Sequence, residues 1–205
     1  MGEAEVDTGR RRGRSKGDLR EEAILAAAER QLASVGYESI TVATLMEEAG
    51  GTRGGFYFYF RTKADAVAAL VERTVSALHV SLESLSVDQP GAEPVDLIRE
   101  LLVRTQAIWA EHGPVMSAAV ELAPTVPAIG DRWAAARDAV TQTATRIAIQ
   151  AGLPDSSASD GAAAVTALLV RMGEGAFYEA TKRAAPPLSE VTATCGLIWQ
   201  RCLGA

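Results

Sequence analysis

Aromatic residues make up only 5% of this 205-residue chain, which also has just two cysteines and two histidines. So little cysteine excludes a small domain held together by disulfides, and the few Cys and His residues form no metal-binding pattern. No apolar run approaches the roughly 18 residues that a membrane-spanning helix needs. The N-terminus is polar and rich in arginine, with no apolar segment after it, so it lacks the pattern of a secretory signal. We therefore expect a cytoplasmic protein.

Catalytic signatures are missing as well. The cysteines, Cys195 and Cys202, are seven positions apart on a predicted helix, so their Cα atoms would be about 10 Å apart, beyond the reach of a disulfide. Neither His79 nor His112 lies in a catalytic motif, and no nucleophile-elbow, zinc-protease, dithiol or phosphate-loop pattern appears. The sequence therefore predicts no enzyme, no cofactor and no metal site.

Charge is divided unevenly along the chain. Residues 1–63 hold 10 Lys or Arg against 10 Asp or Glu, whereas residues 64–205 hold 10 against 16, which gives the net charge of −6. Within residues 8–20, six basic side chains face a single aspartate. Because this positive charge is concentrated at one end, where phosphates would be contacted, the acidic balance does not exclude DNA binding.

Apolar residues recur at helical spacing in most of the chain, and no stretch alternates as a strand would. We expect an all-α fold of about nine helices, with boundaries good to about two to four residues. Residues 1–17 are predicted to be a disordered basic arm, 18–63 a helix-turn-helix domain, and 64–205 a ligand-binding and dimerisation domain. The predicted helices cover about 18–35, 41–49, 52–60, 63–85, 93–112, 114–122, 125–152, 160–183 and 188–203.

The most informative stretch is residues 41–63, which read TVATLMEEAGGTRGGFYFYFRTK. Thr41 can cap a short amphipathic helix, and the Gly-Gly pair after it can adopt the left-handed backbone of a tight turn. Thr52 can cap a second short helix that is crowded with aromatic residues and followed by basic ones. This order of helix, glycine turn and helix is typical of a helix-turn-helix DNA reader.

Residues 41–67 resemble the N-terminal domain of the TetR family of bacterial repressors. The resemblance rests on the helix start at Thr41, the Ala-Gly turn, the aromatic-Tyr-x-Tyr-Phe series and a lysine three residues after Phe60. Within that family, the FYFYF repeat and the placement of the three tryptophans resemble the ethionamide-resistance regulator type. The resemblance implies a transcriptional regulator, a repressor in the first instance, that binds double-stranded operator DNA as a homodimer and is released by a small hydrophobic effector.

The start of the second short helix carries small and polar side chains, which let the backbone approach the major groove. Arg53 is the only side chain there that can donate hydrogen bonds to both O6 and N7 of one guanine. Lys63 and Thr41 are predicted to hold phosphates, Lys63 at the start of the next helix and Thr41 through its hydroxyl and N–H. The resemblance implies that Phe56 and Phe60 are core. The predicted DNA-binding residues are Arg11, Arg12, Arg14, Thr41, Thr52, Arg53, Gly54, Gly55, Tyr57, Phe58, Tyr59 and Lys63.

All three tryptophans lie in the C-terminal part of the chain, with apolar residues at helical spacing around them. Ordinary core is one interpretation of this pattern. The resemblance implies instead a mostly apolar pocket for a lipophilic ligand, which Thr105, Glu174 and Tyr178 would orient. The predicted ligand-binding residues are Leu102, Thr105, Trp109, Met116, Val120, Trp133, Val140, Val170, Glu174, Phe177, Tyr178 and Trp199.

The last two predicted helices are too apolar to face solvent. The resemblance implies that they pair with those of a second copy, which sets two recognition helices on half-sites about 34 Å apart or a multiple of that distance. The predicted interface residues are Val165, Leu168, Leu169, Val191, Leu197 and Ile198. Two other functions stay open at this point: a DNA-binding protein without a ligand, which would have a filled body, and a transcriptional activator.

Overall fold

The computed structural model describes residues 16–85, 91–156 and 158–204, and all nine regular elements in these ranges are α-helices. The predicted all-α fold of about nine helices is confirmed. Most of the predicted basic arm, with Arg11, Arg12 and Arg14, lies outside the described residues. No described helix is both long and apolar enough to cross a membrane. The helices are α1 (Lys16–Ser34), α2 (Gly36–Ser39), α3 (Val42–Glu48), α4 (Arg53–Tyr59), α5 (Lys63–Glu83), α6 (Pro94–Leu122), α7 (Pro127–Gln150), α8 (Ala162–Arg183) and α9 (Leu188–Cys202).

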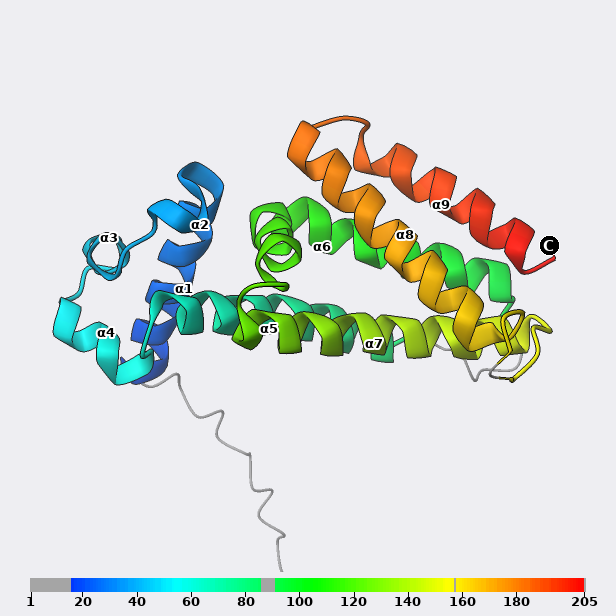
Figure 1. Cartoon of the computed structure of the whole chain (residues 1–205), viewed down its shortest axis with the longest axis horizontal. Helices are drawn as coiled ribbons and strands as arrows, with labels where there is room; N and C mark the ends of the chain where they lie inside the picture. The colour runs from blue at the N-terminus through cyan, green and yellow to red at the C-terminus, as the bar shows by residue number, and fades with distance from the viewer. Residues whose placement is uncertain (1–15, 86–90, 157, 205) are drawn as a thin grey trace, which may run out of the picture.

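The first four helices gather at one end of the molecule, and α6 to α9 form a helical body at the other end (Figure 1). Helix α5 runs from the small N-terminal unit along the body and packs against α1, α6 and α7. Helices α8 and α9 lie side by side on one edge of the body. Helix α5 thus connects the N-terminal unit of α1 to α4 with the body.

A continuous apolar core joins the two parts. In the N-terminal unit, Ile24 of α1, Leu45 of α3 and Phe56 of α4 are each 0% exposed. Val67 and Val71 of α5 are also 0% exposed and belong to the same buried cluster. Because α5 contributes to the core at both ends, a shift of its axis displaces the N-terminal unit as well as the body.

Helix α6 bends within its length. His112 has non-helical angles of φ −120° and ψ 29°, and Pro114 follows inside the helix. Proline supplies no backbone donor and its ring clashes with the preceding turn, so a kink forms here. The two helices predicted at 93–112 and 114–122 are therefore the two halves of one bent helix. The four-residue helix α2 was not predicted, because so short an element has no periodicity of its own.

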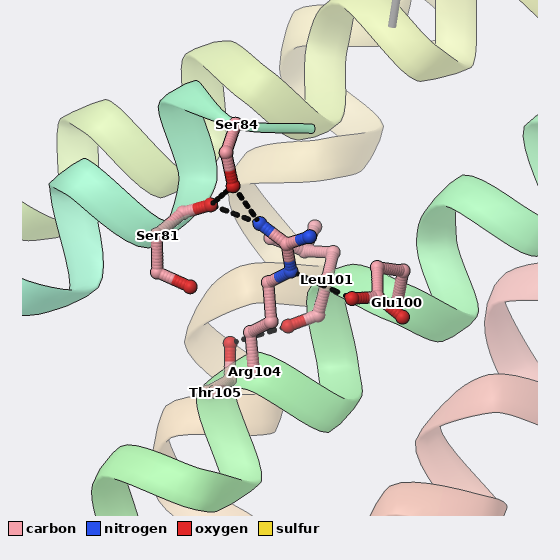
Figure 2. Close-up of polar contacts among 6 residues, drawn as sticks. All are labelled: Ser81, Ser84, Glu100, Leu101, Arg104 and Thr105. Atoms are coloured by element: carbon pink, nitrogen blue, oxygen red, sulfur yellow. Dashed lines mark hydrogen bonds and ion pairs between the residues drawn. The ribbon is translucent and has the colours of Figure 1, made fainter. Parts of the chain in front are cut away.

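An arginine fastens the C-terminal end of α5 to α6 (Figure 2). The Arg104 guanidinium donates to the Ser81 carbonyl and to the Ser84 hydroxyl, the latter at 2.6 Å, and its Nε donates to Glu100 at 2.8 Å. A cation is favourable at a helix C-terminus, where carbonyl groups lack intrahelical partners. The body end of α5 is thus held to α6.

Candidate DNA-binding surface and internal cavity

The turn between α3 and α4 is held from outside by α1. Gly50 has φ +67°, and Arg20 Nη1 donates to the carbonyls of Ala49 at 3.0 Å and Gly50 at 2.9 Å. At Gly51, a Cβ atom would come within 2.3 Å of Met46 Cε. The first glycine is therefore needed for its backbone conformation and the second for the close approach of a side chain.

Both short helices begin with a threonine cap. The Thr41 hydroxyl accepts from Thr44 N–H at 3.1 Å, and the Thr41 N–H donates to the Thr44 hydroxyl at 3.1 Å, which forms a capping box. The Thr52 hydroxyl accepts from Gly55 N–H at 3.3 Å. These caps satisfy backbone donors that a helix leaves open at its start, so α4 is formed despite its two glycines.

A polar network holds α3 against α1. Gln31 donates to Glu48 at 2.9 Å and accepts from the Thr44 hydroxyl at 2.8 Å. Glu48 also pairs with Arg30. The hydrogen bonds from Arg30, and then from Gln31, hold the pKa of Glu48 below its usual value. A carboxylate that accepts two such bonds fixes the position of α3 and so the position of the turn after it.

The outward face of α4 combines buried and exposed aromatic rings. Phe56 and Phe60 are buried, as predicted, whereas Phe58 is 83% exposed and Tyr57 is 52% exposed. An aromatic ring left this open on a short capped helix is more typical of a contact surface than of a folding requirement. Arg53, at the first turn of the helix, is exposed and has no ion-pair or hydrogen-bond partner among the described residues.

Lys63 is turned toward the protein. Its Nζ donates to the carbonyls of Tyr37 at 3.0 Å, Glu38 at 3.2 Å and Ile40 at 3.0 Å, and it lies 4.5 Å from the centre of the Tyr37 ring. These carbonyls belong to the end of α2, where a cation is favourable. All three ammonium donors are occupied, so Lys63 ties α5 to the N-terminal unit.

The body encloses an apolar cavity of about 70 Å³ among α5, α6, α7, α8 and α9. Trp109 and Phe177 stack against each other in its wall, with ring centroids 6.2 Å apart and planes 16° from parallel. Arg137 and Glu174 provide its charged groups and lie 3.3 Å apart. The lining residues are Val75, Leu78, Leu101, Leu102, Thr105, Trp109, Met116, Trp133, Ala136, Arg137, Val140, Leu169, Val170, Gly173, Glu174, Phe177 and Trp199.

The N-terminal unit of α1 to α4 and the helical body both have counterparts in other proteins. Residues 24–70 match the family described as bacterial regulatory proteins, tetR family. The chain is 38% identical over 103 residues to the HTH-type transcriptional regulator EthR of Mycobacterium tuberculosis, which is 50% of this chain and 45% of that protein. It is 30% identical over 125 residues to EthR of Mycolicibacterium smegmatis, with 61% and 57% covered.

The N-terminal unit of the chain is therefore similar to that of tetR-family regulatory proteins, over less than half of the chain. The alignments span about half the length of the curated relatives, so the likeness to EthR concerns that half of the chain. A transcriptional regulator from Rhodococcus sp. Rha1 has the same fold over 90% of this chain and 96% of its own, with a TM-score of 0.76 and 20% identity. The repressor SmeT of the Stenotrophomonas maltophilia multidrug efflux pump SmeDEF superposes with a TM-score of 0.69 at 21% identity, covering 88% of each chain.

The cavity brings together ten of the twelve predicted ligand-binding residues. Val120 and Tyr178 are the exceptions. Val120 lines a separate outer hollow, and Tyr178 donates its hydroxyl to Glu121 at 2.9 Å on the surface of the body. That hydrogen bond to a carboxylate raises the pKa of Tyr178 and directs its hydroxyl away from the cavity. The ten that line the cavity are Leu102, Thr105, Trp109, Met116, Trp133, Val140, Val170, Glu174, Phe177 and Trp199.

Two groups predicted to contact phosphates, at Thr41 and Lys63, have partners within the protein and stay predictions. The Lys63 ammonium is occupied by three carbonyls, and the Thr41 hydroxyl and N–H are occupied by Thr44. Because each of these groups already has protein partners, a phosphate contact would break a helix cap or a junction. The other described residues predicted to bind DNA stay predictions: Thr52, Arg53, Gly54, Gly55, Tyr57, Phe58 and Tyr59.

The predicted dimer face divides into buried and exposed residues. Leu169 and Val191 are only 8% and 6% exposed, so they belong to the core of one chain, and Leu169 also lines the cavity. They offer little surface to a second copy, and their assignment to the interface stays a prediction. Leu168 on α8 and Leu197 on α9 are 71% and 58% exposed. Val165 and Ile198 are half-buried beside them.

Several important side chains were not predicted. Arg20 holds the turn, Arg61 is exposed and unpaired among the described residues after α4, and Arg137 lines the cavity. Val75 and Leu78 of α5 also line it. The aromatic run just before Arg61 could have indicated that this residue lies near the DNA. Arg20 and Arg137 act through contacts with residues far away in the sequence, which no local pattern indicates.

Proposed function

We propose that this protein is a dimeric transcriptional repressor of the TetR family that binds a pseudo-palindromic operator and is released by a small lipophilic ligand. The observation that carries the proposal is the outward face of α4, where Arg53, Tyr57 and Phe58 are exposed on a capped helix. Such a helix fits the major groove, where an arginine can read guanine and aromatic hydroxyls can reach phosphates. The protein would then act on chromosomal DNA in the cytoplasm.

The size of the cavity supports a switch. At about 70 Å³ it is well below the roughly 300 Å³ of the smaller pockets that hold drug-sized ligands. A ligand of that size must therefore spread the surrounding helices, and it binds best to a body that is already spread. A ligand with such a preference shifts the protein toward the state that does not fit the operator.

The junction between body and reader offers a route for that shift. His112, at the kink of α6, lies 2.6 Å from Glu29 of α1, and Arg73 of α5 lies 3.3 Å from the same carboxylate. Trp109 and Met116 flank the kink on α6 and both line the cavity. Displacing these two side chains moves the kink, and Glu29 carries the movement into α1.

The test of DNA reading is selection of bound duplexes from a random pool at physiological salt. Wild type should enrich an inverted repeat, because a two-fold dimer presents the same helix to each half-site. Phe58→Ala and Arg53→Ala should lose or alter that enrichment. Arg99→Ala serves as the matched control, since Arg99 is exposed on α6, outside the N-terminal unit, and paired with Asp96. If the Phe58 and Arg53 variants select the wild-type repeat with unchanged strength, the proposed reading surface is wrong.

A further inference from the structure

A buried indole in the cavity wall has no hydrogen-bond partner. Trp133 of α7 is 6% exposed, and its Nε1 has no acceptor among the described residues. A buried N–H without a partner costs roughly 1–3 kcal/mol, and a native protein usually retains one only where something else supplies the acceptor. Since Trp133 lines the cavity, an occupant of that cavity is one source of the missing acceptor.

Trp133 also stands at a boundary between two spaces. An outer hollow of about 510 Å³ lies beside the cavity, and the two share only Trp133, Arg137 and Glu174 among their lining residues. The inner side is almost wholly apolar, whereas the outer side adds Asp131. A molecule that reached the cavity through the hollow would pass this boundary, and its polar end would come to rest there.

The other polar groups of the cavity are already engaged. The Thr105 hydroxyl donates to the Leu101 carbonyl at 2.9 Å (Figure 2). The Arg137 guanidinium faces the Glu174 carboxylate at 3.3 and 3.4 Å. The indole N–H of Trp133 is therefore a donor that a ligand can satisfy without displacing a protein partner.

Charge at the boundary selects among acceptors. Arg137 contributes +1, and Glu174 and Asp131 contribute −1 each, so the three groups sum to −1. An anion would meet this net negative charge and would compete with Glu174 for Arg137, at a cost that rises in a poorly solvated site. A neutral oxygen acceptor meets neither obstacle.

We infer that the effector is an uncharged apolar molecule with one carbonyl-type oxygen, which accepts the Trp133 indole N–H while the apolar part lies between Trp109 and Phe177. The inference rests on the proposed sensor function and specifies the chemistry of its ligand. Trp133 then orients the ligand, and the charges of Arg137, Glu174 and Asp131 disfavour a ligand with a carboxylate.

The test uses four probes that share an eight-carbon chain: octane, 2-octanone, octanoate and octylammonium. Dissociation constants are measured by calorimetry on wild type, Trp133→Phe and Trp109→Phe. Trp133→Phe keeps an aromatic ring and removes the donor, so 2-octanone should bind about tenfold more weakly while octane changes by less than about twofold. Trp109→Phe is the matched control, and it should change both affinities by the same factor.

Glu174→Gln tests the filter, because it brings the sum at the boundary from −1 to 0. Octanoate should bind wild type more weakly than 2-octanone, and the variant should narrow or reverse that difference. The inference is overturned if Trp133→Phe affects octane and 2-octanone equally, if octanoate or octylammonium binds wild type tightest, or if none of the probes binds. Operator binding by the same samples without a probe is measured in parallel. If wild type does not bind the operator, the proposed function is wrong. If it binds the operator but the probes do not behave as expected, only the inferred ligand chemistry is wrong.

Discussion

Arg53 is the residue through which we expect α4 to read a base. It lies at the first helical position after the Thr52 cap, exposed and without a partner among the described residues. Arg53→Ala should weaken binding to the selected operator by about 1–3 kcal/mol and relax preference at one base pair in each half-site. Binding to a set of single-base operator variants measures this. Unchanged discrimination at every position would show that Arg53 does not read sequence.

Lys63 and Arg61 are two basic residues two positions apart that should behave differently. Lys63→Met removes three hydrogen bonds to carbonyls, so it should lower the free energy of unfolding in urea by about 1–3 kcal/mol. Arg61→Met removes an exposed, unpaired cation, so it should leave stability unchanged and reduce the salt slope of DNA binding by about 1. If Lys63→Met reduced the salt slope without lowering stability, Lys63 would contact a phosphate. If Arg61→Met left the salt slope unchanged, Arg61 would not contact the DNA.

At the scale of elements, the acid sensitivity of α3 follows from Glu48. Its pKa is lowered in the folded protein by the bonds from Arg30 and Gln31, so the ionised carboxylate stabilises the fold above its unfolded pKa. That stabilisation is lost as pH falls below about 4.3 and through the lower folded value. Glu48→Gln should therefore flatten the dependence of unfolding free energy on pH in this range.

Urea unfolding at a series of pH values measures the effect of Glu48→Gln. Glu47→Gln is the matched control, since Glu47 is its exposed neighbour on α3. Equal slopes for wild type and Glu48→Gln would contradict the role given to the α1–α3 network.

The helices were predictable because their signals are local. Thr41 and Thr52 cap the short helices as expected, and Gly50 has the positive φ that its turn requires. Contacts between residues far apart in sequence were not predictable. Lys63 and Tyr37 are 26 positions apart and Tyr178 and Glu121 are 57 apart, and no spacing rule indicates that such pairs meet.

The cavity was largely predictable, because its walls consist of apolar residues at helical spacing that the family resemblance had already marked. Arg137 was missed, since a charged residue on an amphipathic helix is normally assigned to solvent. The burial of Leu169 and Val191 within one chain was not predicted, for a related reason. Periodicity identifies the apolar side of a helix, but it does not tell which part of that side faces the same chain and which faces a second copy.

For the whole molecule, dimerisation should depend on the exposed apolar residues of α8 and α9. Leu168→Asp places a charge where we expect a second copy to pack, so it should shift the protein to monomer and weaken operator binding at least tenfold, about 1.4 kcal/mol. Analytical ultracentrifugation reports the oligomeric state. Val80→Asp is the matched control, because Val80 is 65% exposed on α5. A dimer that survives Leu168→Asp but not Val80→Asp would place the interface elsewhere.

For the whole molecule, we expect that filling the cavity changes the distance between the two α4 helices of the dimer. The direct measurement is the distance between spin labels in the dimer, by pulsed electron resonance, with Glu47→Cys labelled in a Cys202→Ser background. Both positions suit the design, since Glu47 and Cys202 are exposed while Cys195 is buried. On the operator we predict one narrow distance, and saturating 2-octanone should move or broaden it as DNA is released. An identical distance distribution with and without bound ligand would contradict the account.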